Sequence, residues 1–287
     1  MTARGGTEAR GRKVAEAEAL LALVAFAANS LFARLALGAG AIDAASYTAV
    51  RIGSGAAALW LIVQLTSRGT GRRIGGDWQS ALLLVGYALP FSLAYLELTT
   101  GTGALILFGA VQATMIASGL AAGERPSART WAGLVIAMGG LVALVMPGLD
   151  RVSPVGALLM TVAGIAWGAY SIRGRRGTAP LADTTGNFLR GTPLALAGLL
   201  IPGGGPVLTT AGIGWAVASG ALASGVGYAI WYRALPKLSA TGAATLQLAV
   251  PVLAGWAGVV VLGEQVTARL VLAGAAILGG IALARDR

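Results

Sequence analysis

The residues of this 287-residue chain that could do chemistry are a few polar side chains inside long apolar runs. Arg51 and Arg190 lie at equivalent depths in two such runs. A guanidinium can hold a carboxylate through two parallel hydrogen bonds, and a buried charge is costly unless it has a purpose. Each arginine is therefore a candidate substrate contact. The alternative is a structural arginine tied to backbone carbonyls, or to Asp43 and Asp183.

Four neutral polar residues also lie near the middle of apolar runs: Asn29, Ser30, Gln112 and Gln247. Such side chains can offer hydrogen bonds to a zwitterionic substrate. They can equally bind a neighbouring helix, a contact worth about 0.6 kcal/mol on average. Both interpretations stay open.

Aromatic residues gather at similar depths. Tyr87, Phe91 and Tyr95 follow one another at intervals of four, so they share one face of a helix. Trp167 and Tyr228 lie in two other runs. A tyrosine or tryptophan beside a polar cavity presents an apolar wall with one hydrogen-bonding tip, which suits side chains of varied size. The alternative is ordinary helix packing.

Three prolines interrupt the runs, namely Pro90, Pro193 and Pro251. A proline inside a helix removes one backbone hydrogen bond and kinks the helix. These positions are candidate kinks or hinges.

Several classes of chemistry are excluded by what the chain lacks. It has no cysteine and no histidine, so disulfides, thiolate or imidazole metal sites and histidine-based catalysis are excluded. No phosphate-binding P-loop is present, and no Asp or Glu lies in the middle of an apolar run. We expect no enzyme, no cofactor and no metal, and no proton antiport centred on a buried carboxylate.

The composition predicts that lipid surrounds the chain. It is 56% hydrophobic and 11% charged, with a mean hydropathy of +0.77, whereas soluble domains have roughly 25% charged residues. The net charge of +10 comes from short basic clusters between apolar runs. That pattern is typical of cytoplasmic loops and not of a nucleic-acid-binding surface.

The pattern predicts an all-α integral membrane protein, because a membrane-spanning helix needs about 20 apolar residues. Ten such runs occur: 17–38, 43–65, 78–98, 101–122, 128–147, 153–172, 181–201, 210–232, 239–262 and 267–284. Most of the basic residues outside the runs lie on the side of the N-terminus, which places both termini in the cytoplasm. Residues 1–16 form a cytoplasmic tail, of which the first ten are expected to be loose. The first run is long for a cleaved signal peptide, so we expect it to be retained.

An internal repeat divides the runs into two halves, 17–147 and 148–287. An offset of 140 carries Gly123-Glu124 onto Gly263-Glu264 and Asp43 onto Asp183, and an offset of 139 carries Arg51 onto Arg190. Each half has five predicted spans, an odd number, so the second half must be inverted in the membrane. Inverted repeats of this kind place a substrate site near the midplane and supply alternating access.

The longest repeated passages are GERPSARTWAGLVIAMGG (123–140) and GEQVTARLVLAGAAILGG (263–280), accompanied by WYRALPKLSATGAATLQLAVPVLAG (231–255) and GTGALILFGAVQATM (101–115). With these passages the chain resembles the ten-helix EamA-type branch of the drug/metabolite transporter superfamily. The resemblance implies export of small metabolites across the bacterial inner membrane. Within the family the chain is most similar to amino-acid exporters, including the aromatic amino-acid group.

Three functions are therefore to be compared. The leading one is an inner-membrane exporter of amino acids or similar small metabolites that works by alternating access, with or without a coupling ion. The second is an exchanger of phosphorylated or nucleotide-linked sugars, with Arg51 and Arg190 as anion anchors. The third is a membrane scaffold or sensor. The expected partners are a small-molecule substrate and the lipid bilayer, and no nucleic acid.

Two further features concern assembly and helix ends. The chain is expected to be a monomer or a homodimer, because the glycine pairs 139–140 and 279–280 could serve packing within one chain or between two. Glu124 follows Gly123 in the connection before residue 128. We interpret it as a carboxylate that stabilises the positive N-terminal end of the helix that follows.

Overall fold

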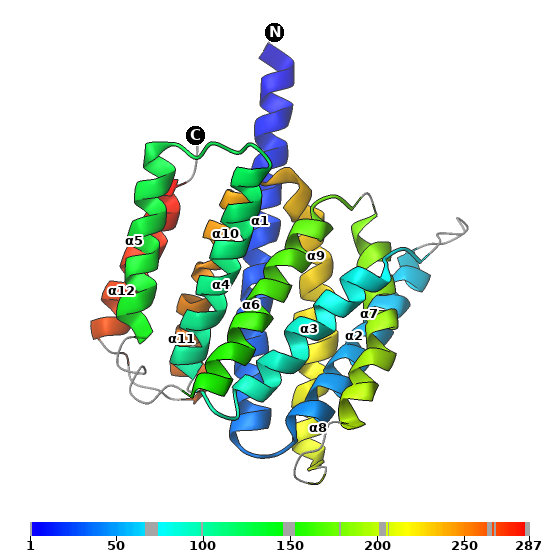
Figure 1. Ribbon diagram of the computed structural model, residues 1–287. Coiled ribbons are helices and arrows are strands. Elements are labelled where there is room, and N and C mark those ends of the chain that lie inside the picture. The colour runs from blue at the N-terminus through cyan, green and yellow to red at the C-terminus, as the bar shows by residue number, and fades with distance from the viewer. Residues whose placement is uncertain are drawn as a thin grey trace.

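The computed structural model describes residues 2–66, 74–98, 100–145, 153–177, 179–200, 205, 207–262, 266 and 268–284. Within these ranges the chain is helical, apart from short connections and one isolated antiparallel β-bridge between Ile42 and Leu208. The helices lie side by side in one bundle, with the N- and C-termini at the same end (Figure 1). The structure therefore agrees with the predicted all-α fold.

Apart from the start of α1, the helices of the first half follow the predicted runs to within a few residues. They are α1 (Thr2–Ala33) with a π-helical continuation η1 (Arg34–Gly38), α2 (Ala44–Thr66), α3 (Trp78–Ala94), α4 (Thr100–Ala121) and α5 (Ala128–Val145). The expectation of a loose N-terminus is wrong, since α1 begins at Thr2 and extends beyond the bundle (Figure 1). Elongating an established helix is far easier than nucleating one, and this segment contains several good helix formers.

The second half has more interruptions. Its helices are α6 (Pro154–Gly174), α7 (Pro180–Ala197) with η3 (Gly198–Leu200), α8 (Thr210–Val217), η4 (Ala218–Val226), α9 (Gly227–Ala234), η5 (Leu235–Lys237), α10 (Ala240–Gln247), α11 (Ala249–Leu262) and α12 (Ala268–Ala284). The segments α8, η4 and α9 follow one another without a gap, and η4 is a π-helix. By length and composition, five of the described helical segments could cross a membrane. The count of ten spans stays a prediction.

The three prolines behave differently. The break between α10 and α11 falls at Leu248, three residues before Pro251. Pro251 has no N–H to donate to the carbonyl of Gln247, four residues earlier, so the helix loses a bond at this point. By contrast, α3 and α7 continue through Pro90 and Pro193. Of the three candidates, Pro251 lies next to a break in its helix, whereas Pro90 and Pro193 do not.

The strongest helix contacts connect the predicted halves. The pairs are α5 with α12, α3 with α6 and α7, α4 with α6 and α10, α2 with α7 and η4, and α1 with α9 and α11. The α5–α12 pair forms one edge of the bundle (Figure 1). A Cβ atom on Gly133 or Gly280 would collide with the backbone of the other helix, so these glycines permit close packing within one chain.

Candidate functional site

Arg51 is among the largest fully buried side chains of the bundle, with 1% of its surface exposed. Its Nε donates to Ser224 Oγ at 3.0 Å, and its second terminal nitrogen (NH2) lies 3.3 Å from Tyr87 Oη and 3.1 Å from Tyr228 Oη. The first terminal nitrogen (NH1) has no hydrogen-bond partner, and no carboxylate in the described part of the chain pairs with this guanidinium. Arg51 is thus a buried cation held by three hydroxyl groups, with donors to spare.

Aromatic rings enclose this guanidinium. Its carbon Cζ lies 5.3 Å from the ring centroid of Tyr87, a cation–π distance. Trp167 contacts both Tyr87 and Tyr228, at centroid distances of 5.2 and 4.9 Å. Phe26 from α1 packs edge-on against Trp167 and Tyr228. We call Arg51, Tyr87, Trp167, Tyr228 and Phe26 the arginine cage. Its members come from α2, α3, α6, α9 and α1, so both predicted halves contribute.

The two glutamines take different roles. Gln247 accepts a 2.6 Å hydrogen bond from Trp167 Nε1, which joins it to the edge of the arginine cage. Its amide nitrogen lies 3.2 Å from the sulfur of Met115. Gln112 instead donates to the backbone carbonyl of Ala244, and its own oxygen is buried without a hydrogen-bond partner among the residues that the structure describes. Gln247 therefore lies beside the cage, whereas Gln112 connects α4 to α10.

Asn29 belongs to a neighbouring hydrogen-bond chain. Tyr47 donates to Ser219 Oγ at 2.8 Å, and Ser219 in turn bonds to Asn29 Oδ1. Tyr47 lies one helical turn before Arg51, so this chain supports the same stretch of α2. Ser30 is half-buried at the next position of α1, and none of the contacts found in the described residues connects it to this chain.

The π-helix η4 supplies two of these partners, Ser219 and Ser224, which the sequence interpretation missed. It packs along α2, where a Cβ on Gly220 would collide with the backbone at Arg51. π-Helical turns inside α-helices are frequent at functional sites. The small-residue run ASGALASGV was the only available signal, and it also fits plain helix packing.

Arg190 and Tyr95 lie outside the cage. Arg190 donates to the carbonyls of Gly75 and Gly186, at 2.8 and 3.0 Å. This is the structural arrangement that the sequence left open as the alternative. Tyr95 is the residue that ends α3, and it packs edge-on against Phe91 with a centroid distance of 4.7 Å. The two arginines at equivalent sequence positions thus have different surroundings.

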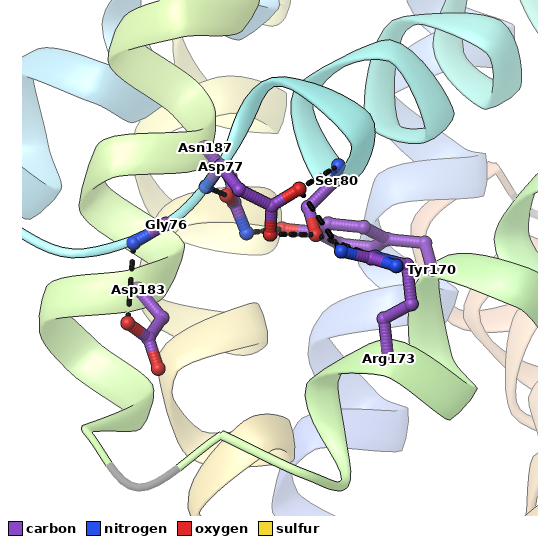
Figure 2. Close-up of polar contacts among 7 residues, drawn as sticks. All are labelled: Gly76, Asp77, Ser80, Tyr170, Arg173, Asp183 and Asn187. Carbon is purple, nitrogen blue, oxygen red and sulfur yellow. Dashed lines mark hydrogen bonds and ion pairs between the residues drawn. The ribbon is translucent and has the colours of Figure 1, made fainter.

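A cavity of about 420 Å³ opens at the end of the bundle where α6 ends and α3 and α7 begin. Its polar lining includes Asp77, Arg173 and Asn187, which the sequence interpretation missed, together with Asp183 and Tyr170 (Figure 2). Tyr232 also lines it. Asp77 precedes an ordinary helix, and nothing in its spacing distinguished it from any other N-cap residue. We call this the polar cavity.

Asp77 organises one wall of the polar cavity. It caps α3 by accepting from Ser80 N at 2.9 Å, and it pairs with Arg173 at 3.1 Å. Burial raises the pKa of this carboxyl, but the hydrogen bonds from Ser80 and the charge of Arg173 outweigh burial and hold the pKa below its ordinary value. Asp77 therefore stays ionised at neutral pH.

Two residues of α7, Asp183 and Asn187, hold the backbone at this cap and just before it. The N–H of Gly76 donates to Asp183 at 3.1 Å, and the N–H of Asp77 donates to Asn187 at 3.0 Å (Figure 2). Asn187 also donates to Tyr170 Oη at 3.3 Å. The start of α3 is thus attached to α7 through side chains.

Glu124 stabilises a helix end, but a different one from that expected. It accepts from the backbone nitrogens of Ala240 and Thr241, at 2.8 and 3.2 Å, so it caps α10 and not α5. It also pairs with Arg175 at 3.3 Å. Burial alone would raise the pKa of Glu124. The hydrogen bonds from α10 outweigh burial, so the pKa lies below its ordinary value. In the folded chain the N-terminus of α10 lies beside Glu124, although the two are more than 100 residues apart in the sequence.

Comparison with known proteins identifies this architecture. Residues 154–285, from the start of α6 through α12, match the EamA-like transporter family. An uncharacterized protein of Pseudomonas aeruginosa is 49% identical over 264 residues, which cover 92% of each chain. The chain belongs to the EamA-like transporter family. It is accordingly a multi-pass membrane transporter.

The fold of this EamA-like transporter also has a solved counterpart. A protein known from its crystal structure aligns with a TM-score of 0.75 over 92% of this chain and 97% of the other. The two sequences are 24% identical. At that identity the likeness concerns the fold alone, and the substrate has to be argued from the arginine cage.

Proposed function

We propose that this EamA-like transporter exports amino acids or similar small metabolites across the bacterial inner membrane, with the substrate carboxylate bound at Arg51. The observation that carries the proposal is the buried, unpaired guanidinium. A charge without a counter-ion in a membrane protein costs free energy, and hydroxyl partners offset only part of that cost. An arriving carboxylate would complete the site through Arg51, and the rings of Tyr87, Trp167 and Tyr228 would contact its side chain.

The proposed mechanism is alternating access between two inverted halves, 17–147 and 148–287. Exchanging the halves exchanges α1 with α6, α2 with α7, and α3 with the α8–η4–α9 segment. It also exchanges α4 with the α10–α11 segment and α5 with α12. The α3–α6 contact then becomes the α1–α9 contact, α4–α6 becomes α1–α11, and α3–α7 becomes α2–η4, all of which occur. The pairs α2–α7, α4–α10 and α5–α12 exchange with themselves. This pattern supports two structurally equivalent halves, as an inverted repeat requires.

The surroundings of Arg190 argue against the sugar-phosphate exchanger. That function requires two cationic anchors at one site, but Arg190 is bound to Gly75 and Gly186, and Arg51 shares no hydrogen-bond partner with it. A single guanidinium balances the charge of one carboxylate but only part of the charge of a phosphate monoester. The polar cavity likewise favours transport over a scaffold, because a scaffold has no need of an opening that approaches the cage.

The test is flux into proteoliposomes that contain purified protein and a panel of labelled amino acids, with and without a proton gradient. We expect flux for at least one amino acid, and a loss of about 100-fold or more in Arg51→Gln, since a buried charged contact is worth about 3–5 kcal/mol. Arg51→Gln should fold normally, because the change removes an uncompensated buried charge. Absence of flux across the whole panel would exclude the proposed substrate class.

A further inference from the structure

The polar cavity has a balanced set of charges. Two aspartates, Asp77 and Asp183, and two arginines, Arg173 and Arg176, line it. The pairing of Asp77 with Arg173 leaves further donors on that guanidinium. Asp183 uses one carboxylate oxygen to accept from Gly76, and Figure 2 shows the other oxygen directed away from this bond. The cavity thus offers an acceptor and a cationic donor without a net charge.

A second, independent feature is the hydroxyl of Tyr232. Tyr232 lines the polar cavity and is 3% exposed, and its buried Oη makes no well-aligned hydrogen bond among the described residues, although the hydroxyl of Ser171 lies beside it. Leaving a buried hydroxyl unpaired costs free energy. A ligand that brings a hydrogen-bonding group into the cavity would remove this cost.

Aromatic rings connect the polar cavity with the arginine cage. Tyr232 and Tyr170 contact each other at a centroid distance of 5.2 Å, and both contact Tyr228, at 6.4 and 6.5 Å. Tyr228 is a direct hydrogen-bond partner of Arg51. One layer of tyrosines therefore separates the cavity from the cage. A substrate entering through the cavity would have to pass this layer to reach Arg51.

We propose that the polar cavity is a second binding site for small zwitterions, occupied before the substrate passes the tyrosine layer to Arg51. The ammonium group binds Asp183, and the carboxylate binds Arg173 and Tyr232 Oη. The balanced charges favour a zwitterion over a phosphorylated anion, which two carboxylates would repel. The inference deepens the proposed function and rests on it for the direction of passage, but binding at the cavity can be tested without transport.

The first experiment measures kcat and KM for flux of L-phenylalanine and L-alanine from the side of the cavity in proteoliposomes. Asp183→Asn keeps an oxygen for Gly76 but loses the charge, so we expect KM to rise about tenfold with kcat unchanged. Tyr232→Phe removes a hydroxyl that makes no well-aligned hydrogen bond in the described part of the chain, so we expect little effect on the fold while KM rises about threefold. The matched control is Glu97→Gln, which loses a carboxylate that accepts from Ser153 beyond the far end of α3, away from the cavity, and should leave this KM unchanged. Unchanged KM in both cavity variants would overturn the second site.

The second experiment separates this inference from the proposed function. Isothermal titration of L-phenylalanine into Arg51→Gln should detect binding at the cavity alone, weakened by adding Asp183→Asn, with glucose 6-phosphate giving no binding. If wild-type protein transports no amino acid but this binding is found, the second site stands and the proposed function fails. No binding of L-phenylalanine to Arg51→Gln would overturn the second site whatever the flux result.

Discussion

At both ends of the central helices an aspartate accepts a hydrogen bond from the backbone of the opposite half, but the surroundings of the two aspartates differ. At the end with the polar cavity, Asp183 holds the backbone N–H of Gly76, just before α3. At the other end, Asp43 holds the backbone N–H of Val207, at 3.2 Å, just before α8. Asp43 and Asp183 are the pair related by the sequence repeat. In each case a carboxylate at the start of one helix fixes the loop that enters a helix of the opposite half.

What surrounds the two aspartates differs. At the Asp43 end the two loops also bond through their backbones, from Asp43 N to Val207 O at 3.1 Å and from Thr209 N to Ala41 O at 3.0 Å, around the bridge between Ile42 and Leu208. At the Asp183 end one backbone bond, from Gly75 N to Ala182 O at 3.2 Å, accompanies the side-chain bonds of Asn187 and Arg190, and a cavity lies beside them. The difference suggests one end joined tightly and one end accessible, as expected of a single state of an alternating-access cycle.

The largest expected effect comes from locking the Asp43 end. The chain has no cysteine, so Ile42→Cys with Leu208→Cys introduces a single possible disulfide. Opposed residues of an antiparallel bridge have Cα atoms about 4.5–5.5 Å apart, within disulfide range. We expect oxidation to abolish flux and reduction to restore it, because the proposed alternating-access cycle requires this end to open. The single-cysteine variants are the controls. Full flux in a fully cross-linked sample would show that this end does not open during transport.

The positions of most helices could be predicted from the sequence, because the length of each apolar run can be read from the order of the residues. The sequence interpretation also named Arg51, Tyr87, Trp167 and Tyr228 as candidates, and the structure places these four together. It could not separate Arg51 from Arg190, since depth in a span says nothing about rotation when nearly every face of the helix is apolar. The partners decide the matter: Gly75 lies 115 residues from Arg190, and Ser224 lies 173 residues from Arg51.

The next effect in size concerns Arg190, which belongs to the cavity end. Arg190→Gln loses two hydrogen bonds from a charged donor to backbone carbonyls, so we expect the free energy of unfolding to fall by about 1–3 kcal/mol. The KM of the remaining folded protein should be unchanged, because Arg190 contacts the backbone and not the cage. Thermal unfolding in detergent and flux in proteoliposomes measure the two quantities, with Arg51→Gln as the opposite case. Lost substrate binding at unchanged stability would make Arg190 a substrate contact after all.

The smallest effect is acid sensitivity, which both ends should share. Burial raises the pKa of Asp43, but the hydrogen bonds from Ser46 and Val207 outweigh it and lower the pKa, as Ser80 and Arg173 do for Asp77. A carboxylate with a lowered pKa in the folded state stabilises the protein above its unfolded pKa. That contribution is lost as the pH falls through the folded pKa, so unfolding temperatures should be flat above about pH 5 and decline below about pH 4.

Substitution of each aspartate separates the contributions of the two ends to this decline. Asp43→Asn and Asp77→Asn should each lower the unfolding temperature at neutral pH and make the decline in acid shallower. The effect should be small for Asp77, whose side chain is 48% exposed and whose pair with Arg173 is screened by solvent. Asp43 also accepts from the backbone of both halves, through Ser46 and Val207. If the Asp43 end is the tighter one, Asp43→Asn will flatten the acid decline more than Asp77→Asn, and the reverse order would contradict the comparison.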